Sequence, residues 1–427
     1  MILQVLVPAL IIMIALSILK CPIYISVLCS AIYLQLFVNH MSLTNLFTGF
    51  FEAMTKNALL AVPFFMVAGS LIAASSLGTR LINVFIELLK TVRGGLPIAC
   101  VLSNAVFGAI SGSGPAATAT FGKIVHEPLS QRHGEKMSLG IITSSAALST
   151  IIPPSITMII YGVATETSIP KLFLAGIGPG LLIVLVVSVY LIVRCKKNPD
   201  APVEHFSGKA LLTAVWKGLP VLILPVIVLG GVYTGFVTPT ESGALAAAYS
   251  FVVAVFITRD IKPRQLIGVF KDAGRTTAQV FLLIAASTVF SQAITIAQIP
   301  AAVTEAFSGM GRIQFLLMLN ILLLIVGCFF DTSAAILILA PILLPTASLL
   351  GIPALHLGMV FVVNLAIGLF TPPFGLNIFV AQSVLKRPMG LISRSCVPFI
   401  ILYIASVLVI TYVPELSTAL PALLMGA

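Results

Sequence analysis

Apolar runs long enough to cross a lipid bilayer recur along this chain from one end to the other. Only 8% of its 427 residues are charged and 59% are hydrophobic, whereas a soluble domain carries roughly 25% charged residues. So little polar surface cannot coat a water-soluble globule, and the bilayer must therefore be the solvent. We predict an all-α polytopic membrane protein. Its expected crossings are 2–19, 21–38, 57–76, 138–163, 171–193, 218–236, 240–258, 277–295, 355–385 and 391–413.

Two further apolar stretches, about 96–126 and 313–346, are longer than one crossing and contain polar, glycine- or proline-bearing breaks near their middle. We interpret each stretch as a re-entrant helical hairpin, which enters the membrane and returns to the same side. Non-helical backbone at that depth persists only where it is buried in protein or lines a cavity. The two hairpins are therefore the first candidates for a functional site.

The basic residues predict an orientation. With the N-terminus outside and both stretches folded as hairpins, all but three of the 23 Lys and Arg residues fall on the inner side, and only Lys56, Lys171 and Arg312 face outward. We therefore expect both termini to lie on the outer side of the membrane. The basic residues form no patch beside aromatic residues, so the net charge of +10 gives no indication of nucleic-acid binding.

The two halves of the chain share an order of elements at a constant offset of 219 residues. At this offset, Pro153-Pro154 matches Pro372-Pro373, and Ser113-Gly114-Pro115-Ala116 matches Thr332-Ser333-Ala334-Ala335. Each half contains a span, a short amphipathic arm, a hairpin and a proline-broken span, and the two hairpins start from opposite sides. Inverted repeats with paired broken helices are typical of secondary transporters, whose site lies at the midplane. The expected arms are 80–92 and 298–310.

The first hairpin has the residue types of an ion site. Glycines and Pro115 interrupt the helix and free backbone carbonyls, while the hydroxyls of Ser111 and Ser113 add oxygen ligands. Hard cations such as Na⁺ prefer oxygen ligands, and the helix that starts after the break offers its positive end to an anion. The alternative is a seam of small residues that lets helices approach closely.

Residues in the broken spans and the second hairpin extend this interpretation. Pro153 and Pro154 remove two backbone donors and break a span, either as a plain kink or to free carbonyls for a cation. Asp331 is the only carboxylate well inside an apolar stretch, which makes it a functional candidate. It can bind Na⁺, carry a proton or cap the helix that follows. Glu241 is expected to be a structural residue at the start of a helix whose N-cap is Thr238 or Thr240.

Several kinds of chemistry are not indicated. The five histidines fall in loops or at span ends, so no metal cluster or Ser/His pair is expected within the membrane. A hydrolase that used Ser111 or Ser113 would lack a base. No GxxxxGK[ST] motif is present. We therefore predict that the chain is not an enzyme.

Several long and specific runs lie between about residues 20 and 410. They are FFEAMTKNALLAVPFFMVAGSLI, VFGAISGSGPAATATFG, IIPPSITMIIYG, YTGFVTPTESGALAAAY, FFDTSAAILILAPILLP and FTPPFGLNIFV. These runs resemble the large M subunit of tripartite ATP-independent periplasmic (TRAP) transporters, and are most similar to the sialic acid type. The resemblance implies a bacterial inner membrane, so that both outward-facing termini are expected in the periplasm. In many members an acidic residue follows the glycine-serine tip, but Ala116 to Phe121 contains none, so its role is not transferred.

The resemblance implies an elevator-type transporter in which a transport domain slides against a scaffold. Scaffold helices are then expected at 1–56 and 166–275, the two inverted repeats of the transport domain at 57–165 and 276–390, and a C-terminal helix at 391–427. It also implies Na⁺ sites at the hairpin tips and broken helices. The matching residues here are Ser111, Gly112, Ser113, Pro153, Asp331, Thr332, Gly368 and Thr371.

The resulting hypothesis is Na⁺-coupled uptake of a small organic anion. The resemblance further implies a small four-helix membrane subunit (Q) and a soluble periplasmic substrate-binding protein (P) as partners. A stand-alone anion symporter, or a proton- or sodium-coupled ion antiporter of similar fold, is the alternative. The substrate carboxylate is expected to bind between the ions, against helix ends and polar groups. The residues expected to contact it are Ser113, Gly114, Pro115, Ser149, Thr150, Ser333 and Asn377.

Overall fold

A computed structural model describes residues 2–19, 21–196, 205–307 and 309–426, and within these ranges the regular structure is entirely helical. Lys20 and Lys197, two of the basic residues behind the predicted orientation, lie outside the described residues. The first half contains α1 (Ile2–Ile18), α2 (Ile23–Tyr33), α3 (Leu43–Met54), α4 (Ala61–Ala74), α5 (Leu77–Leu89), α6 (Gly95–Ser111), α7 (Gly114–His133), α8 (Glu135–Ser145), α9 (Leu148–Ile151), α10 (Ile156–Thr165) and α11 (Ile169–Lys196).

The second half continues with helices of the same kind. These are α12 (Gly208–Tyr233), α13 (Pro239–Val252), α14 (Pro263–Ile296), α15 (Ile299–Phe307), α16 (Arg312–Phe329), α17 (Thr332–Leu349), α18 (Ala354–Gly368), α19 (Leu376–Leu385), α20 (Met389–Tyr412) and α21 (Glu415–Met425). Short π- or 3₁₀-helical segments at Leu34–Val38, Asn57–Leu60 and Val253–Ile257 extend α2, precede α4 and extend α13.

The helix lengths agree with a multi-pass membrane protein. Among the described residues, eight helices are long and apolar enough to cross a bilayer, or nine if the bent pair Glu135–Ile151 and Ile156–Thr165 forms one span. The two helices of the second predicted hairpin, α16 and α17, each pass this test with 18 residues. Length alone therefore does not decide between a re-entrant hairpin and two crossings. Two helices, α3 and α21, were not among the expected crossings or arms.

The predicted breaks occur where glycine, proline and capping residues end the helices. α6 ends at Gly112, whose left-handed φ of 57° suits glycine, and α7 starts directly afterwards with Ser113 as its N-cap. The first proline-broken span is interrupted between Ile151 and Ile156, and the second between Gly368 and Leu376. The peptide bonds Pro153-Pro154 and Pro372-Pro373 are both cis.

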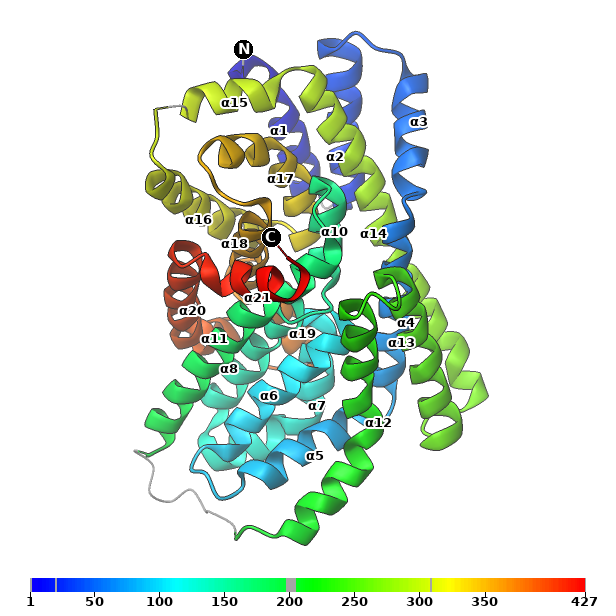
Figure 1. Ribbon diagram of the computed structural model, residues 1–427, viewed down its shortest axis with the longest axis vertical. Coiled ribbons are helices and arrows are strands. Elements are labelled where there is room, and N and C mark those ends of the chain that lie inside the picture. Colours follow the sequence, from blue (N-terminus) through cyan, green and yellow to red (C-terminus); the bar gives the residue numbers. More distant parts are fainter. Residues whose placement is uncertain (1, 20, 197–204, 308, 427) are drawn as a thin grey trace.

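Helices of the two halves occupy opposite ends of the molecule. The predicted arms are α5, which crosses the lower end, and α15, which crosses the upper end (Figure 1). The pair α6 and α7 lies in the lower half and the pair α16 and α17 in the upper half (Figure 1). One continuous hydrophobic core joins residues of α6 and α7 to residues of α16, α17 and α18. The hairpin tips of both halves are thereby held near the middle of the molecule.

Candidate substrate and cation site

The tips of both predicted hairpins open into one cavity of about 430 Å³. Gly112 to Pro115 reach it from the first half, and Asp331, Thr332 and Ser333 reach it from the second. Thr150, Ile156 and Thr157 beside the first proline break, and Leu369 and Leu376 beside the second, complete the central wall. Segments more than 200 positions apart in the sequence are thus brought together around one space. The remaining lining comes from α4, α14 and the segment Pro22–Tyr24.

The lining of this cavity follows the internal repeat. Five residues of the first half and five of the second line the wall as pairs separated by the same offset of 219 positions. The pairs are Gly112 with Asp331, Ser113 with Thr332, Gly114 with Ser333, Thr150 with Leu369, and Thr157 with Leu376. The chemistry of the pairs is unequal, because only the second half contributes a carboxylate. The two halves therefore have equivalent positions at the cavity and different groups on them.

Two helix N-termini reach the cavity. The hydroxyl of Ser113 accepts a hydrogen bond from the backbone N–H of Ala116 (3.5 Å), which caps α7. The carboxylate of Asp331 accepts one from the N–H of Ser333 (2.9 Å), which caps α17. Each N-terminus carries a partial positive charge that favours an anion. Three roles were considered for Asp331, and the structure contains one of them, the helix cap. Because the side chain also lines the cavity, its carboxylate oxygens are placed where they can bind a cation.

The other predicted cap is confirmed. Thr238 caps α13 by accepting from the N–H of Glu241 (3.2 Å), and the Glu241 carboxylate accepts in return from the N–H of Thr238 (2.8 Å). Glu241 is a structural residue of the helix start, as expected from the sequence.

Eight of the predicted site residues line the cavity: Gly112, Ser113, Gly114, Pro115, Thr150, Asp331, Thr332 and Ser333. Ser111 and Pro153 are buried behind this wall. The hydroxyl of Ser111 accepts a weak hydrogen bond from the N–H of Ser113 (3.4 Å) and so supports the tip from behind. The prediction that Ser111 and Pro153 coordinate an ion directly has no cavity contact to support it.

Ser149 and Gly368 lie at a contact between helices instead of at the cavity. The hydroxyl of Ser149 donates to the carbonyl of Asn104 on α6 (3.1 Å), and its Cα lies 2.4 Å from where a Cβ on Gly108 would be. In the second half, a Cβ on Gly368 would lie 2.2 Å from the carbonyl oxygen of Gly327 on α16. These two contacts are again 219 positions apart. In this structure Ser149 and Gly368 therefore contribute to helix packing, and their expected contacts with substrate and ion stay predictions.

Thr371 and Asn377 lie close to the tips without lining the cavity. The Thr371 hydroxyl donates to the carbonyl of Ile367 (2.7 Å), which uses its proton within the chain. The side-chain amide of Asn377 donates to the carbonyl of Thr143 (3.2 Å). Its Oδ1 is buried, has no hydrogen-bond partner among the described residues, and lies 3.0 Å from where a Cβ on Gly114 would be. Asn377 thus supports the first turn of α7 from behind.

The sequence analysis missed the face that α14 turns toward the cavity. Thr276, Gln279, Val280 and Leu283 line it from this helix, with spacings of three, four and seven residues. That spacing is one face of an α-helix. The sequence signal for this face is a pair of polar residues, Thr276 and Gln279, at helical spacing beside a long apolar run. The expected crossing starts at 277 and therefore does not include Thr276. Tyr24 and Met66 were likewise not expected.

The tip glycine supplies a first prediction. Gly112 has a φ of 57°, and a Cβ there would lie 3.1 Å from the backbone nitrogen of Ile156. Gly112→Ala is expected to cost about 1–2 kcal/mol from backbone strain. At the Na⁺ site that the family resemblance implies, it should weaken Na⁺ binding by about tenfold, because the tip must shift. Sodium-dependent thermal stabilisation of the purified protein measures this. Gly351→Ala is the control, since Gly351 has a φ of 67° with nothing within 4 Å of its Cβ position. Equal loss of Na⁺ response in both variants would contradict a role for the tip.

Apolar spanning helices and a central cavity with helix N-termini define a membrane permease. The family model described as "Tripartite ATP-independent periplasmic transporter, DctM component" matches residues 10–416. The chain therefore belongs to the DctM family of TRAP transporter large permeases, and it is not an enzyme. The resemblance to a TRAP M subunit is thus confirmed at the level of the family.

Similar proteins include curated permeases and a solved transporter. The C4-dicarboxylate TRAP transporter large permease protein DctM of Pseudomonas aeruginosa is 40% identical over 385 residues, which cover 89% of this chain and 90% of that protein. The isethionate TRAP transporter permease protein DctMQ of Oleidesulfovibrio alaskensis is 38% identical over 86% of this chain and 58% of its own length. The YdaH transporter of Alcanivorax borkumensis has the same overall fold, with a TM-score of 0.57, 14% identity, and coverage of 86% of this chain and 87% of that one.

Proposed function

We propose that this permease couples the inward movement of Na⁺ to the uptake of a small organic anion, with both bound in the cavity between the hairpin tips. The observation that carries this proposal is the convergence of Asp331, hydroxyl groups and two helix N-termini on one cavity. Such a wall offers oxygen ligands to a cation and positive helix ends to a carboxylate. The two ligands would stabilise each other because their charges are opposite.

The residues divide between these two roles. Asp331, Thr332 and the tip around Gly112 and Ser113 supply oxygens for Na⁺. Gly114, Pro115 and Ser333 lie in the first turns of α7 and α17, whose partial positive charge suits a carboxylate. The N–H of Ser333 already donates to Asp331, and Pro115 has no N–H. Thr150 is a further hydroxyl on the same wall. Ser111, Pro153, Thr371 and Asn377 hold the tips from behind.

Movement of the cavity is proposed to follow an elevator mechanism. Support comes from the five pairs of lining residues with a common offset and from the arms α5 and α15 at opposite ends of the molecule (Figure 1). An inverted repeat with paired broken helices suits a transport domain formed by 57–165 and 276–390, with 1–56 and 166–275 as scaffold. In this arrangement the two helix pairs are re-entrant and both termini are periplasmic, as the charge asymmetry favours.

The proposed coupling is energetically sufficient. One net positive charge moving inward gains about 2.3 kcal/mol per 100 mV of membrane potential. A tenfold Na⁺ gradient adds roughly 1.4 kcal/mol per ion. Two Na⁺ ions with a monoanion thus supply about 5 kcal/mol in total, enough for accumulation of more than roughly a thousandfold.

The relatives favour a small acid as substrate. Those described above are named for C4-dicarboxylates and isethionate, both of which are small organic anions. We propose a C4-dicarboxylate or an acid of similar size. The sialic acid type suggested by the sequence runs stays a prediction that the same substrate panel tests.

The proposed transporter works with two partners. A membrane subunit Q is supported by the relative named DctMQ, of which this chain covers 58%. A soluble periplasmic protein P, which delivers the substrate, is supported by the family to which the chain belongs. Omission of P from a reconstituted system is expected to abolish uptake. Full uptake by the permease alone would instead favour a stand-alone symporter.

The decisive experiment measures uptake into proteoliposomes with imposed ion gradients. An inward Na⁺ gradient is expected to drive uptake of a C4-dicarboxylate from P by at least tenfold over a K⁺ gradient of the same size. Collapse of the pH gradient should leave this rate unchanged. The panel includes succinate, malate, isethionate and N-acetylneuraminate, each with its own binding protein. Uptake that ignores Na⁺ and follows a proton gradient would contradict the proposal and make Asp331 the proton carrier.

A further inference from the structure

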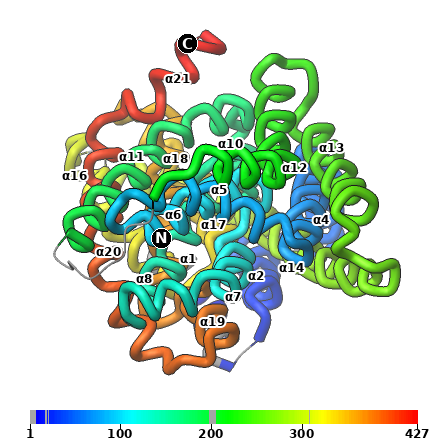
Figure 2. The backbone as a smooth tube through the Cα atoms, turned by 90° about the horizontal axis from the view of Figure 1, so that it is seen from below, coloured from blue at the N-terminus to red at the C-terminus, as the bar shows by residue number. Residues whose placement is uncertain are grey.

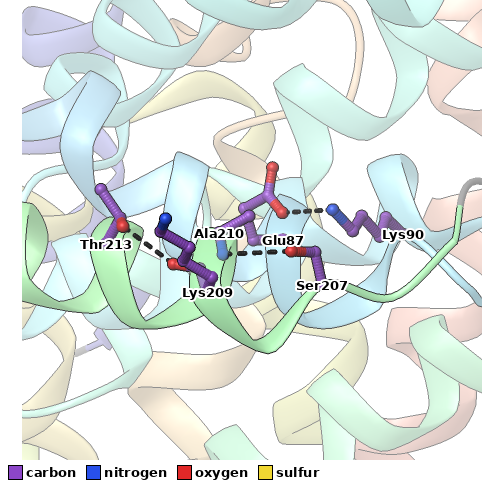
Figure 3. Close-up of polar contacts among 6 residues, drawn as sticks. All are labelled: Glu87, Lys90, Ser207, Lys209, Ala210 and Thr213. Atoms are coloured by element: carbon purple, nitrogen blue, oxygen red, sulfur yellow. Dashed lines mark hydrogen bonds and ion pairs between the residues drawn. The ribbon is translucent and has the colours of Figure 1, made fainter.

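A second cavity, which shares no lining residue with the cavity at the hairpin tips, lies between the arm α5 and the first turns of α12. Its volume is about 590 Å³. Arg80 and Glu87 line it from α5, and Lys209, Thr213 and Lys217 line it from α12. The two helices run side by side at the lower end of the molecule (Figures 1 and 2). Figure 3 shows Ser207, Lys209 and Thr213 along the start of α12, beside Glu87 of α5 and Lys90, which directly follows α5.

The charges around this cavity do not cancel. Glu87 is already paired, because the Lys90 ammonium donates to its carboxylate at 2.6 Å. Arg80 donates to the hydroxyl of Ser76 (2.9 Å), which in turn donates to the carboxylate of Asp260 (2.7 Å). No carboxylate of the described residues lies within ion-pair distance of Lys209 or Lys217. The cavity therefore has an excess of positive charge contributed by the two lysines of α12.

Asp260 accepts two hydrogen bonds from Ser76 and lies in the field of Arg80. Burial tends to raise the pKa of its carboxyl, but hydrogen bonds from Ser76 and the nearby charge of Arg80 outweigh this and lower the pKa. Asp260 is therefore ionised near neutral pH and balances Arg80. No ion pair joins Asp260 to Lys209 or Lys217. Among the described residues, no carboxylate is left to balance these two lysines.

The α12 segment is built like a helix end at a membrane surface. Lys209, Thr213 and Lys217 are spaced by four residues and follow one face of the helix. Leu212 and Trp216, on the neighbouring face, are 70% and 75% exposed, and the continuous apolar run of α12 starts directly after Lys217. Tryptophan collects at the level of lipid headgroups, and lysine extends its ammonium toward them. Cationic and exposed apolar groups thus meet at the entrance of one cavity.

We propose that this cavity binds the phosphate of an anionic phospholipid headgroup, with an acyl chain along Leu212 and Trp216. Lys209 and Lys217 would contact the phosphate. The Thr213 hydroxyl lies between them in sequence and donates its own proton to the carbonyl of Lys209 (2.8 Å). A free phosphate compound offers the same anionic group, but it would leave the exposed apolar face uncovered. The lipid would hold the arm α5 against α12. Basic pockets beside spanning helices bind such headgroups by charge and hydrogen bonding.

Binding of phosphatidylglycerol to the purified, delipidated full-length permease tests the proposal, with native mass spectrometry counting bound lipids. The double variant Lys209→Gln/Lys217→Gln is expected to bind phosphatidylglycerol about thirtyfold more weakly. Each lysine near a membrane surface contributes about 1 kcal/mol to the attraction of an anionic lipid, and the loss of two such contributions corresponds to about thirtyfold in affinity. The control Lys123→Gln/Lys271→Gln removes the same charge from exposed positions outside the cavity. It is expected to keep wild-type affinity. Phosphatidylcholine should bind both variants and the wild type equally weakly.

Two further measurements make the outcome decisive. The thermal midpoint of each variant in lipid-free detergent is expected to match the wild type, which separates loss of binding from loss of folding. Glycerol 1-phosphate at the same concentration should not displace phosphatidylglycerol, since it lacks the acyl chains. Equal lipid affinity of the two double variants would overturn the site. Complete displacement by glycerol 1-phosphate would overturn the lipid as its ligand in favour of a soluble phosphate.

Discussion

Replacement of Asp331 by alanine is expected to reduce Na⁺-driven uptake by at least about 100-fold. The carboxylate lines the cavity and supplies its only acidic group among the described lining residues. Asp331 is half-buried, and its partner in the proposed site is Na⁺. Removal of one partner from a desolvated pair of opposite charges costs up to about 3–5 kcal/mol, and a loss of 2.7 kcal/mol already corresponds to about 100-fold. Initial uptake rates at saturating substrate, measured over a range of Na⁺ concentrations in proteoliposomes, check the expected loss of Na⁺ affinity.

Asp331→Asn separates the charge from the helix cap. Asparagine is as good an N-cap as aspartate, and its side-chain oxygen can still accept from the N–H of Ser333. We therefore expect a thermal midpoint close to the wild type in Asp331→Asn, a lower one in Asp331→Ala, and the same large loss of Na⁺ affinity in both. Wild-type Na⁺ dependence in Asp331→Asn would reduce Asp331 to a cap and refute its role as a cation ligand.

The positions of the breaks could be predicted from the sequence because glycine, proline and capping residues act locally. The turn at Gly112, the N-caps Ser113 and Asp331, and both proline breaks follow from the residues at those points. The common offset of 219 then indicated that the two tips are equivalent positions of a repeat. Their convergence on one cavity is the structural counterpart of that pattern.

The face that each broken helix turns to the cavity could not be predicted. Ser149 and Thr150 are neighbours of similar chemistry, yet Thr150 lines the cavity while Ser149 donates to Asn104 on α6. In a helix buried on all sides, the apolar pattern has no period that would distinguish these faces. For the same reason, the positions of Thr276 and Gln279 at the cavity could not be predicted. Their polar face on α14 can be assigned to the cavity only when the positions of the tips are known.

The small residues of the predicted hairpins and broken spans were interpreted either as part of an ion site or as a seam that lets helices approach closely. Each interpretation fits different positions. Gly112 forms the turn of a tip that lines the cavity, as a binding tip requires. Gly108, Gly327 and Gly368 instead bring helix backbones into direct contact, which is the seam of small residues considered as the alternative. The two contacts, Gly108 with Ser149 and Gly327 with Gly368, join the first helix of each pair to the adjacent broken span. Each tip is thereby fixed to the helix break with which it shares the cavity.

These contacts predict a sharp asymmetry between two glycines that touch each other. A Cβ on Gly368 would lie 2.2 Å from the carbonyl oxygen of Gly327, and only a shift of α18 away from α16 relieves that clash. Gly368→Ala is expected to cost at least about 3 kcal/mol and to lower the thermal midpoint by roughly 5–10 °C. Gly327→Ala should be tolerated, because its Cβ would meet its nearest neighbours at 3.4 Å, an ordinary van der Waals distance.

The first half provides the same test at its equivalent contact. Gly108→Ala should destabilise like Gly368→Ala, since its Cβ would lie 2.4 Å from the Cα of Ser149. Gly230→Ala in α12, with nothing within 4 Å, should leave the midpoint unchanged or raise it, because alanine favours a helix by about 1 kcal/mol over glycine. Thermal unfolding of the four purified variants, followed by tryptophan fluorescence or light scattering, decides the matter. Equal midpoints for Gly368→Ala and Gly327→Ala would mean that α16 and α18 are not in backbone contact, and the support that this contact gives to the second tip would be lost.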